Sequence, residues 1–165
     1  MTLGPSSRAA RRLTRTTPPA VARAGLTSTG GAVNTDIALL AQLVLLVPWL
    51  TTLELRLFVN DYQPTPTSRW WDFTEATFPG YSRQPLEVWS PPYLVPGPVA
   101  VTEACVKAWT NGSSGVPQTI YGYFVVTPVG MVAWAERDPH PLPLSVGGEQ
   151  YTVQAVRTLR GQDTT

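Results

Sequence analysis

The chain has 165 residues, of which 43% are hydrophobic and 14% are charged, and its formal net charge is +1. This length predicts one domain plus a tail, with enough residues to bury a core without staples. One cysteine and one histidine exclude an internal disulfide and a Cys/His zinc site, and the small net charge excludes a general polyanion binder. The charged share lies below the usual value of about 25%, so burial of surface in an oligomer or a larger assembly is expected.

Residues 1–34 are predicted to be a basic arm. Small and polar residues dominate them, no apolar period is visible, and no acid occurs before Asp36. Such a segment either stays solvated or orders on a negatively charged partner, such as an acidic protein surface or nucleic acid. It also resembles an organelle transit peptide or a twin-arginine signal, although no compact apolar region follows at the right distance. The candidate partner-binding residues of this arm are Arg8, Arg11, Arg12, Arg15 and Arg23.

The most apolar part of the chain comes next. Residues 37–50 contain only one polar side chain, Gln42, and the run is shorter than the roughly 20 residues of a membrane span. A capping residue at Asp36 and a proline at Pro48 predict a short helix over residues 36–47. Because this helix is apolar nearly all round, it must be buried against a sheet or a neighbouring subunit. The candidate interface residues here are Leu43, Leu46 and Trp49.

Alternating apolar and polar residues predict strands through most of the remaining chain. They occur at residues 53–59, at residues 99–110 and at residues 151–159, and Leu86 and Val88, with Trp89, mark a further short strand. The stretch "TIYGYFVVTPVGMVAWAERD" predicts a hairpin, because two apolar runs flank the tight turn Thr127–Gly130.

Turn and loop signals separate these strands. Pro79-Gly80, Asn111-Gly112 and Gly147-Gly148 predict turns. Proline-rich loops are expected over residues 63–71, 90–98 and 138–150, because proline cannot join a ladder of hydrogen bonds.

The whole pattern predicts a mainly β domain over residues 35–160, followed by a frayed end at residues 161–165. Six or seven short strands with one short helix in front are typical of an antiparallel β-sandwich or a Greek-key barrel.

Residues that could carry catalysis are sparse. Cys105 lies in an alternating run, which predicts a small core or interface residue. His140 stands between two prolines, no phosphate-binding glycine loop or G-x-S-x-G motif occurs, and the acidic residues fit ordinary surface charge. We therefore expect a binding or structural protein without metal or cofactor, and not an enzyme.

Aromatic residues gather between positions 70 and 93. Three interpretations stay open: they close the ends of the sandwich, they form a protein interface, or they make a platform for sugars. The candidate interface residues in this segment are Trp70, Trp71, Phe78 and Tyr81. The formal glycosylation sequon at Asn111 is explained equally well as a turn.

Two stretches, "LELRLFVNDYQPT…DFTEATFPGYSRQPL" and "IYGYFVVTPVGMVAWAERD", resemble small β-rich structural proteins of tailed phages and prophages. The matching pieces are residues 60–62, residues 73–81 and residues 120–126, within a resemblance that covers about residues 52–160. Arg137-Asp138 departs from the aromatic end of the family's last motif, and the arm is not covered.

The resemblance implies a virion structural protein, most simply a capsid decoration (cement) protein that stabilises the shell by binding the major capsid protein. Such proteins are often small trimers over junctions between capsid subunits, so a homo-oligomer at the capsid surface, assembled in the host cytoplasm, is expected. The resemblance implies neither a membrane nor a specific nucleic-acid partner. The alternatives are a tail or fibre component whose Trp-rich loops touch host sugars, and a carbohydrate-binding module.

Overall fold

The computed structural model describes residues 36–96, 99–112 and 117–160. The predicted arm (residues 1–34) and the predicted frayed end (residues 161–165) therefore lie outside the described residues. Thr35, the first residue of the predicted domain, also lies outside them. The predicted fold class is confirmed: the chain is mainly β, with antiparallel sheets and one α-helix. The described elements are α1 (Asp36–Leu50), β1 (Glu54–Phe58), η1 (Trp70–Asp72), β2 (Gln84–Pro85), β3 (Tyr93–Val95), β4 (Val99–Glu103), β5 (Lys107–Thr110), β6 (Gln118–Val126), β7 (Val132–Leu144), β8 (Gln150–Val153) and β9 (Val156–Arg160).

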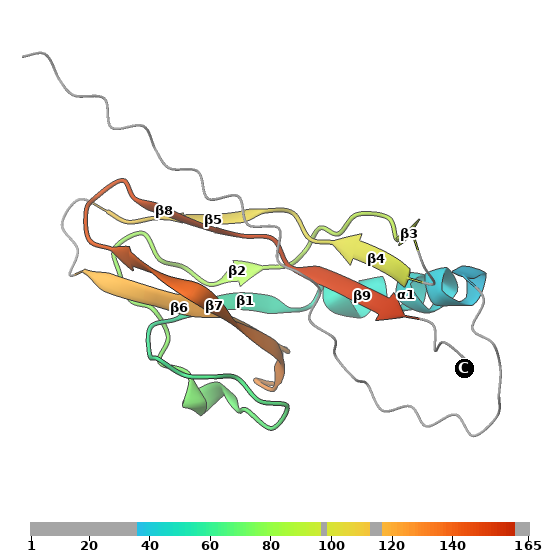
Figure 1. Ribbon diagram of the computed structural model, residues 1–165, viewed down its shortest axis with the longest axis horizontal. Helices are drawn as coiled ribbons and strands as arrows, with labels where there is room; N and C mark the ends of the chain where they lie inside the picture. The colour runs from blue at the N-terminus through green and yellow to red at the C-terminus, as the bar shows by residue number, and fades with distance from the viewer. Residues whose placement is uncertain (1–35, 97–98, 113–116, 161–165) are drawn as a thin grey trace, which may run out of the picture.

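A sandwich makes up one end of the molecule (Figure 1). Its larger sheet has the strand order β2-β1-β6-β7, and its smaller one pairs β5 with β8. Inward side chains of both sheets form the main core, to which Leu55 and Leu57 of β1 contribute together with Trp109 of β5 and Tyr151 of β8. The alternation predicted for residues 53–59 is thus observed on β1.

The other end of the molecule is a helix on a sheet (Figure 1). Strands β3, β4 and β9 form a three-stranded sheet. Leu39 and Leu43 of α1 pack with Ala100 of β4 in a separate apolar cluster. The predicted burial of the helix against a sheet is therefore correct for this side of α1.

A bent ribbon joins the two ends. Each of the long strands predicted at residues 99–110 and 151–159 is split between two sheets, because β4 leads into β5 and β8 leads into β9. The register runs from Glu103↔Val156 to Lys107↔Val153, so three residues on one side oppose two on the other. Such a bulge bends a strand pair and turns the extra residue away from the ladder. Cys105 lies there and is exposed, so the core alternative of its prediction is wrong and the interface alternative stays a prediction.

The outer face of the larger sheet is also covered. Phe58 and Phe124 point to this side and pack with Phe73, which belongs to the segment after β1. The rings of Phe73 and Phe124 are stacked, with centroids 4.7 Å apart. A side chain at Gly122 would overlap the carbonyl oxygen of Glu136 and meet the Phe58 ring, so the close approach of β7 requires glycine there.

The predicted proline-rich loop at residues 138–150 is largely a strand. β7 continues to Leu144, and Pro143 pairs with Thr119 of β6. Proline is accepted in a ladder where its missing N–H faces an open edge. Strand β7 is such an edge, and the alternate spacing of Pro139, Pro141 and Pro143 keeps their nitrogens on one side. The prolines also discourage pairing with another chain.

Helix α1 does not end at Val47 as predicted but continues through Pro48 to Leu50. Pro48 removes the hydrogen bond that an N–H at this position would donate to the Val44 carbonyl, and α1 ends two residues later. The last turn is completed by other donors: the Thr51 amide bonds to the Val47 carbonyl at 3.0 Å, and the Thr51 hydroxyl bonds to the Pro48 carbonyl at 2.8 Å. Among the described residues, no helix is long and apolar enough to cross a membrane.

Two shorter predictions also need correction. The loop expected over residues 90–98 contains β3, which pairs with β4. The strand expected at Leu86, Val88 and Trp89 is wrong: β2 ends before it at Pro85, Leu86 follows as a core residue, and Val88 is exposed. The turns at Gly80, Gly130 and Gly148 are confirmed, since all three glycines have positive φ angles between 82° and 91°.

Candidate interaction surfaces

The structure divides the predicted interface residues into core and surface. Leu43 and Phe78 are 0% and 3% exposed within the chain itself, so they are core residues and not available to a partner. Leu46 and Tyr81 are half-buried. Trp49, Trp70 and Trp71 are exposed. The five arginines predicted for the arm lie outside the described residues.

Helix α1 carries two apolar stripes on opposite sides. The buried stripe has the spacing i, i+4, i+7, i+11 and consists of Leu39, Leu43, Leu46 and Leu50. The exposed one has nearly the same spacing, and we call it the α1 stripe: Ile37, Ala41, Val44, Leu45 and Pro48.

The α1 stripe is an uncharged surface. Leu45 and Ile37 are 80% and 77% exposed, and no residue from Ile37 to Leu50 carries a charge. Tyr93 and Leu94 of the neighbouring strand β3 are exposed as well. A contiguous apolar surface on a folded protein is often a contact site for another molecule. The sequence predicted a buried helix but missed the α1 stripe, because both stripes have helical spacing and neither is polar.

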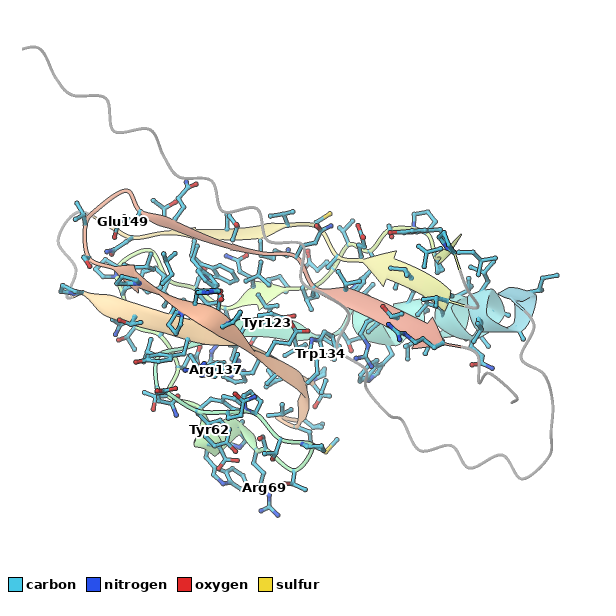
Figure 2. The ribbon with its side chains drawn as sticks, in the orientation of Figure 1. Tyr62, Arg69, Tyr123, Trp134, Arg137 and Glu149 are labelled. Carbon is cyan, nitrogen blue, oxygen red and sulfur yellow. The ribbon has the colours of Figure 1, made fainter. Side chains whose placement is uncertain are left out.

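A second exposed site lies on the segment that crosses the outer face of the larger sheet. We call residues 60–72 the Trp loop. Trp70 and Trp71 are 52% and 57% exposed, and their rings meet edge to face with centroids 5.7 Å apart. The Arg69 guanidinium lies 5.1 Å from the centre of the Trp71 ring. Figure 2 shows Arg69 at the tip of this protrusion.

The Trp loop is held in shape by its own polar groups. The Asn60 amide bridges the two ends, donating to the Asp72 carbonyl at 2.9 Å and accepting from the Thr74 amide at 2.7 Å. The Ser68 hydroxyl bonds with the Tyr62 hydroxyl at 2.9 Å. The Asp72 carboxylate accepts from the Arg69 amide at 2.7 Å, as in a capping interaction.

A carboxylate network fixes the segment that follows. Glu75 accepts two hydrogen bonds from Arg83, at 2.8 Å and 3.0 Å, and one from the Tyr81 hydroxyl at 2.8 Å. Arg56 of β1 lies 3.5 Å away. Burial opposes ionisation of Glu75, but the bonds from Arg83 and Tyr81 outweigh it and hold the pKa of Glu75 below its ordinary value.

The partners of Glu75 respond in the expected direction. Burial and the bond to Glu75 raise the pKa of the Tyr81 hydroxyl, and the same carboxylate raises the pKa of Arg83. Asn60, Glu75 and Tyr81 all belong to the motifs that resemble phage proteins. In this chain their side chains bind other parts of the chain, so the motifs are structural.

A second polar cluster connects β9 to the larger sheet. The Arg157 guanidinium stacks 4.6 Å from the centre of the Trp134 ring. Burial lowers the pKa of Arg157 and raises that of Tyr123, and Glu136 acts on both groups by raising their pKa values. Tyr123 on β6 and Trp134 on β7 lie close together in Figure 2, on the side of the sandwich nearer to β9. This cluster fastens the two ends of the molecule to each other.

The remaining chemical candidates do not come together. Within residues 36–96, 99–112 and 117–160, no three His, Cys, Asp or Glu residues form a group that could hold a metal ion. Cys105 lies on the bulge between β4 and β5, whereas His140 lies on β7. The Asn111 side chain is 2% exposed and donates to the Leu144 carbonyl at 3.3 Å, so the sequon does not present a free amide.

Comparisons with protein-family models, curated proteins and solved structures gave no match. The resemblance to phage structural proteins therefore stays a prediction that rests on the two quoted stretches alone.

Proposed function

We propose that this chain is a virion structural protein of a tailed phage or prophage, and that it decorates the capsid by docking the α1 stripe on the major capsid protein. The α1 stripe is the observation that carries the proposal. It is an apolar, uncharged face about three turns long at one end of the molecule (Figure 1). Leaving Ile37, Val44 and Leu45 in water forfeits the free energy of burying them, roughly 25 cal/mol per Å².

The location of the α1 stripe supports docking on a larger body. The helix is already fixed to its own sheet through Leu39 and Leu43, so its outward face is rigid before a partner arrives. A rigid surface loses less entropy on binding than one that must first be ordered. The exposed Trp49 and Tyr93 extend the surface with aromatic side chains, which are enriched at interface centres.

The resemblance supplies the kind of partner. The residues that carry it build the fold through Asn60, Glu75 and Tyr81, which suits a family defined by a shared scaffold. In the proposed assembly the protein is a homo-oligomer, with a trimer favoured, at the capsid surface. The basic arm adds contacts across the shell, and several arms on one oligomer add avidity.

Sedimentation with empty shells of the same virus tests this function. The wild-type protein should form a stable oligomer and co-sediment with the shells, and it should raise their thermal stability. Leu45→Glu should weaken shell binding by about tenfold or more, because it buries a charge at the contact. Val129→Glu is the matched control, since Val129 is 78% exposed in the β6–β7 turn, outside the α1 stripe.

The outcomes distinguish a wrong function from a wrong contact surface. A wild-type protein that ignores the shells overturns the decoration function. Wild-type binding that Leu45→Glu and Val44→Glu leave unchanged overturns only the assignment of the α1 stripe as the contact.

A further inference from the structure

The six tryptophans of the chain fall into distinct environments. Trp89, Trp109 and Trp134 are at most 9% exposed. The indole N–H groups of Trp89 and Trp109 are satisfied by the carbonyls of Leu86 and Ser82, at 2.8 Å and 2.6 Å. Trp70 and Trp71 are more than half exposed. Within the described parts of the chain, neither of their N–H groups has an acceptor.

The exposure of this pair is built into a rigid segment. Phe73, directly after the tryptophans, fills the inward position and stacks on Phe124 of β6. Tyr62 packs on the same Phe73 ring from the other end of the Trp loop, edge to face at 5.2 Å. The two anchors and the Asn60 bridge leave the indoles pointing outward from a fixed backbone. A ligand would therefore meet a preorganised pair of aromatic rings.

Polar side chains share the loop with the two rings. Gln63, Thr65, Thr67 and Arg69 are all exposed on the Trp loop, and the Arg69 guanidinium lies over the Trp71 ring. Hydroxyl, amide and guanidinium groups on the same loop as exposed indole rings suit a ligand with one apolar and one hydroxylated surface. Pyranose sugars have both: axial C–H bonds on the faces of the ring and hydroxyl groups around its rim.

We propose that the Trp loop is a glycan-binding site. The indole of Trp70 or Trp71 stacks against the C–H face of a pyranose ring. Arg69, Gln63 and the free indole N–H groups donate hydrogen bonds to the sugar hydroxyls. The site is independent of the proposed capsid contact, because it uses neither α1 nor β3.

Two other classes of ligand fit the Trp loop less well. Single-stranded nucleic acid also stacks on aromatic rings, but its binding depends on a basic groove that follows the phosphates. The Trp loop has one arginine and two aspartates, Asp61 and Asp72, and Arg137 of β7 forms an ion pair with Asp61 at 2.6 Å, so the two signs balance and there is no excess of positive charge. A protein interface has a buried core that is more apolar than its rim, whereas residues 63, 65, 67, 68 and 69 of the same loop are polar.

Calorimetric titration of the full chain with chitohexaose, cellohexaose and trigalacturonate tests the site, after a first screen on a printed oligosaccharide panel. We expect saturable binding to at least one of these sugars. Trp70→Ala or Trp71→Ala should weaken it by about tenfold, as loss of a stacking ring implies. Phenylalanine at the same position should restore part of the affinity, because it keeps a ring without the indole N–H.

Trp49→Ala is the matched control, because Trp49 is an exposed tryptophan on α1. It should leave sugar binding unchanged, and all variants should keep the thermal midpoint of the wild type. No saturable binding on the panel or in the titrations overturns the glycan site. Sugar binding that survives both alanine variants also overturns it. If these variants weaken shell binding and no sugar binds, the Trp loop is a protein contact and the glycan site is wrong.

Discussion

Glu75 shows how one side chain can hold several segments together. It accepts hydrogen bonds from Tyr81 and Arg83 and lies beside Arg56 of β1. The Tyr81 hydroxyl in turn accepts from the Leu57 amide at 3.4 Å. Loss of the carboxylate charge would take the charged acceptor away from the half-buried Tyr81 hydroxyl and from the Arg56 and Arg83 guanidinium groups, and hydrogen bonds to a charged group are stronger than those to a neutral one.

Glu75→Gln should therefore lower the free energy of unfolding by about 1–3 kcal/mol at pH 7. The pKa of Glu75 is depressed in the folded state from its ordinary value of 4.5. Its ionised form stabilises the fold above that value, and this contribution disappears as the pH falls through the folded-state pKa. The difference between wild type and variant, measured by urea denaturation, should shrink between pH 7 and pH 3. Glu87→Gln, at an exposed glutamate, should show no such difference at either pH.

At the scale of elements, α1 is a helix with two different tasks. Its inner stripe packs on the β3-β4-β9 sheet and its outer stripe is the proposed capsid contact, although the two have nearly the same composition. Leu43 is 0% exposed and Leu45 is 80% exposed, two positions apart on the same helix. A charged residue should therefore destabilise the fold strongly at position 43 and hardly at all at position 45.

Leu43→Asp should destabilise the monomer by several kcal/mol, because it places an unpaired charge in the apolar cluster with Leu39 and Ala100. Leu45→Asp should change the free energy of unfolding by less than about 0.5 kcal/mol, as is usual at exposed sites. Thermal and urea unfolding of the two variants measure this directly. Equal stability of the two would mean that α1 does not pack on β4 as described.

Strand β6 of the β6–β7 hairpin is buried on both faces. Tyr123 belongs to the main core and Phe124 to the cluster with Phe58 and Phe73. The sequence predicts a half-buried strand with one inward aromatic residue, whereas the structure places both residues inside.

Tyr123→Ala and Phe124→Ala should each lower the free energy of unfolding by about 3 kcal/mol, since both remove a buried ring. Chemical denaturation with tryptophan fluorescence measures both. Met131→Ala, at a 64% exposed position in the same hairpin, should change it little. A silent Phe124→Ala would contradict the packing of residues 59–76 over the outer face of the sheet.

Sequence patterns predict well the elements that depend only on neighbouring residues in the chain. The alternation of β1 and the turn at residues 127–130 are local signals, and both are found. The break between β4 and β5 depends on the register with β8 and β9, which is set by distant residues. The extension of β7 depends on its being an edge, because prolines that forbid a central strand are harmless there. Neither fact is visible in a local window.

The candidate surfaces follow the same rule. The sequence does not decide whether Trp70 and Trp71 are buried or exposed, because it does not show that Phe73 takes the inward position. Likewise, the all-apolar sequence of α1 predicts burial, but it does not show that one side of the helix is exposed in the folded chain. The residue types of a surface can be predicted from the sequence, whereas the exposure of their side chains depends on which other parts of the fold cover them.

At the scale of the whole molecule, the two candidate surfaces lie on different bodies. Helix α1 covers the β3-β4-β9 sheet at one end, and the Trp loop projects from the sandwich (Figure 1). The ribbon of β4–β5 and β8–β9 connects the two bodies, and the stacking of Arg157 on Trp134 adds a side-chain contact between them. A protein docked through α1 would therefore still present its Trp loop to other ligands.

This arrangement predicts that the protein can link a shell to a glycan. Shells coated with the wild-type protein should be retained on a surface that carries the sugar bound in titration, and uncoated shells should pass. Leu45→Glu should bind the sugar surface without retaining shells, because its charge lies at the proposed capsid contact. Trp70→Ala combined with Trp71→Ala should coat the shells without attaching them to the surface. Retention of shells can be measured by surface plasmon resonance. If either variant lost both activities while remaining folded, the two surfaces would not be independent.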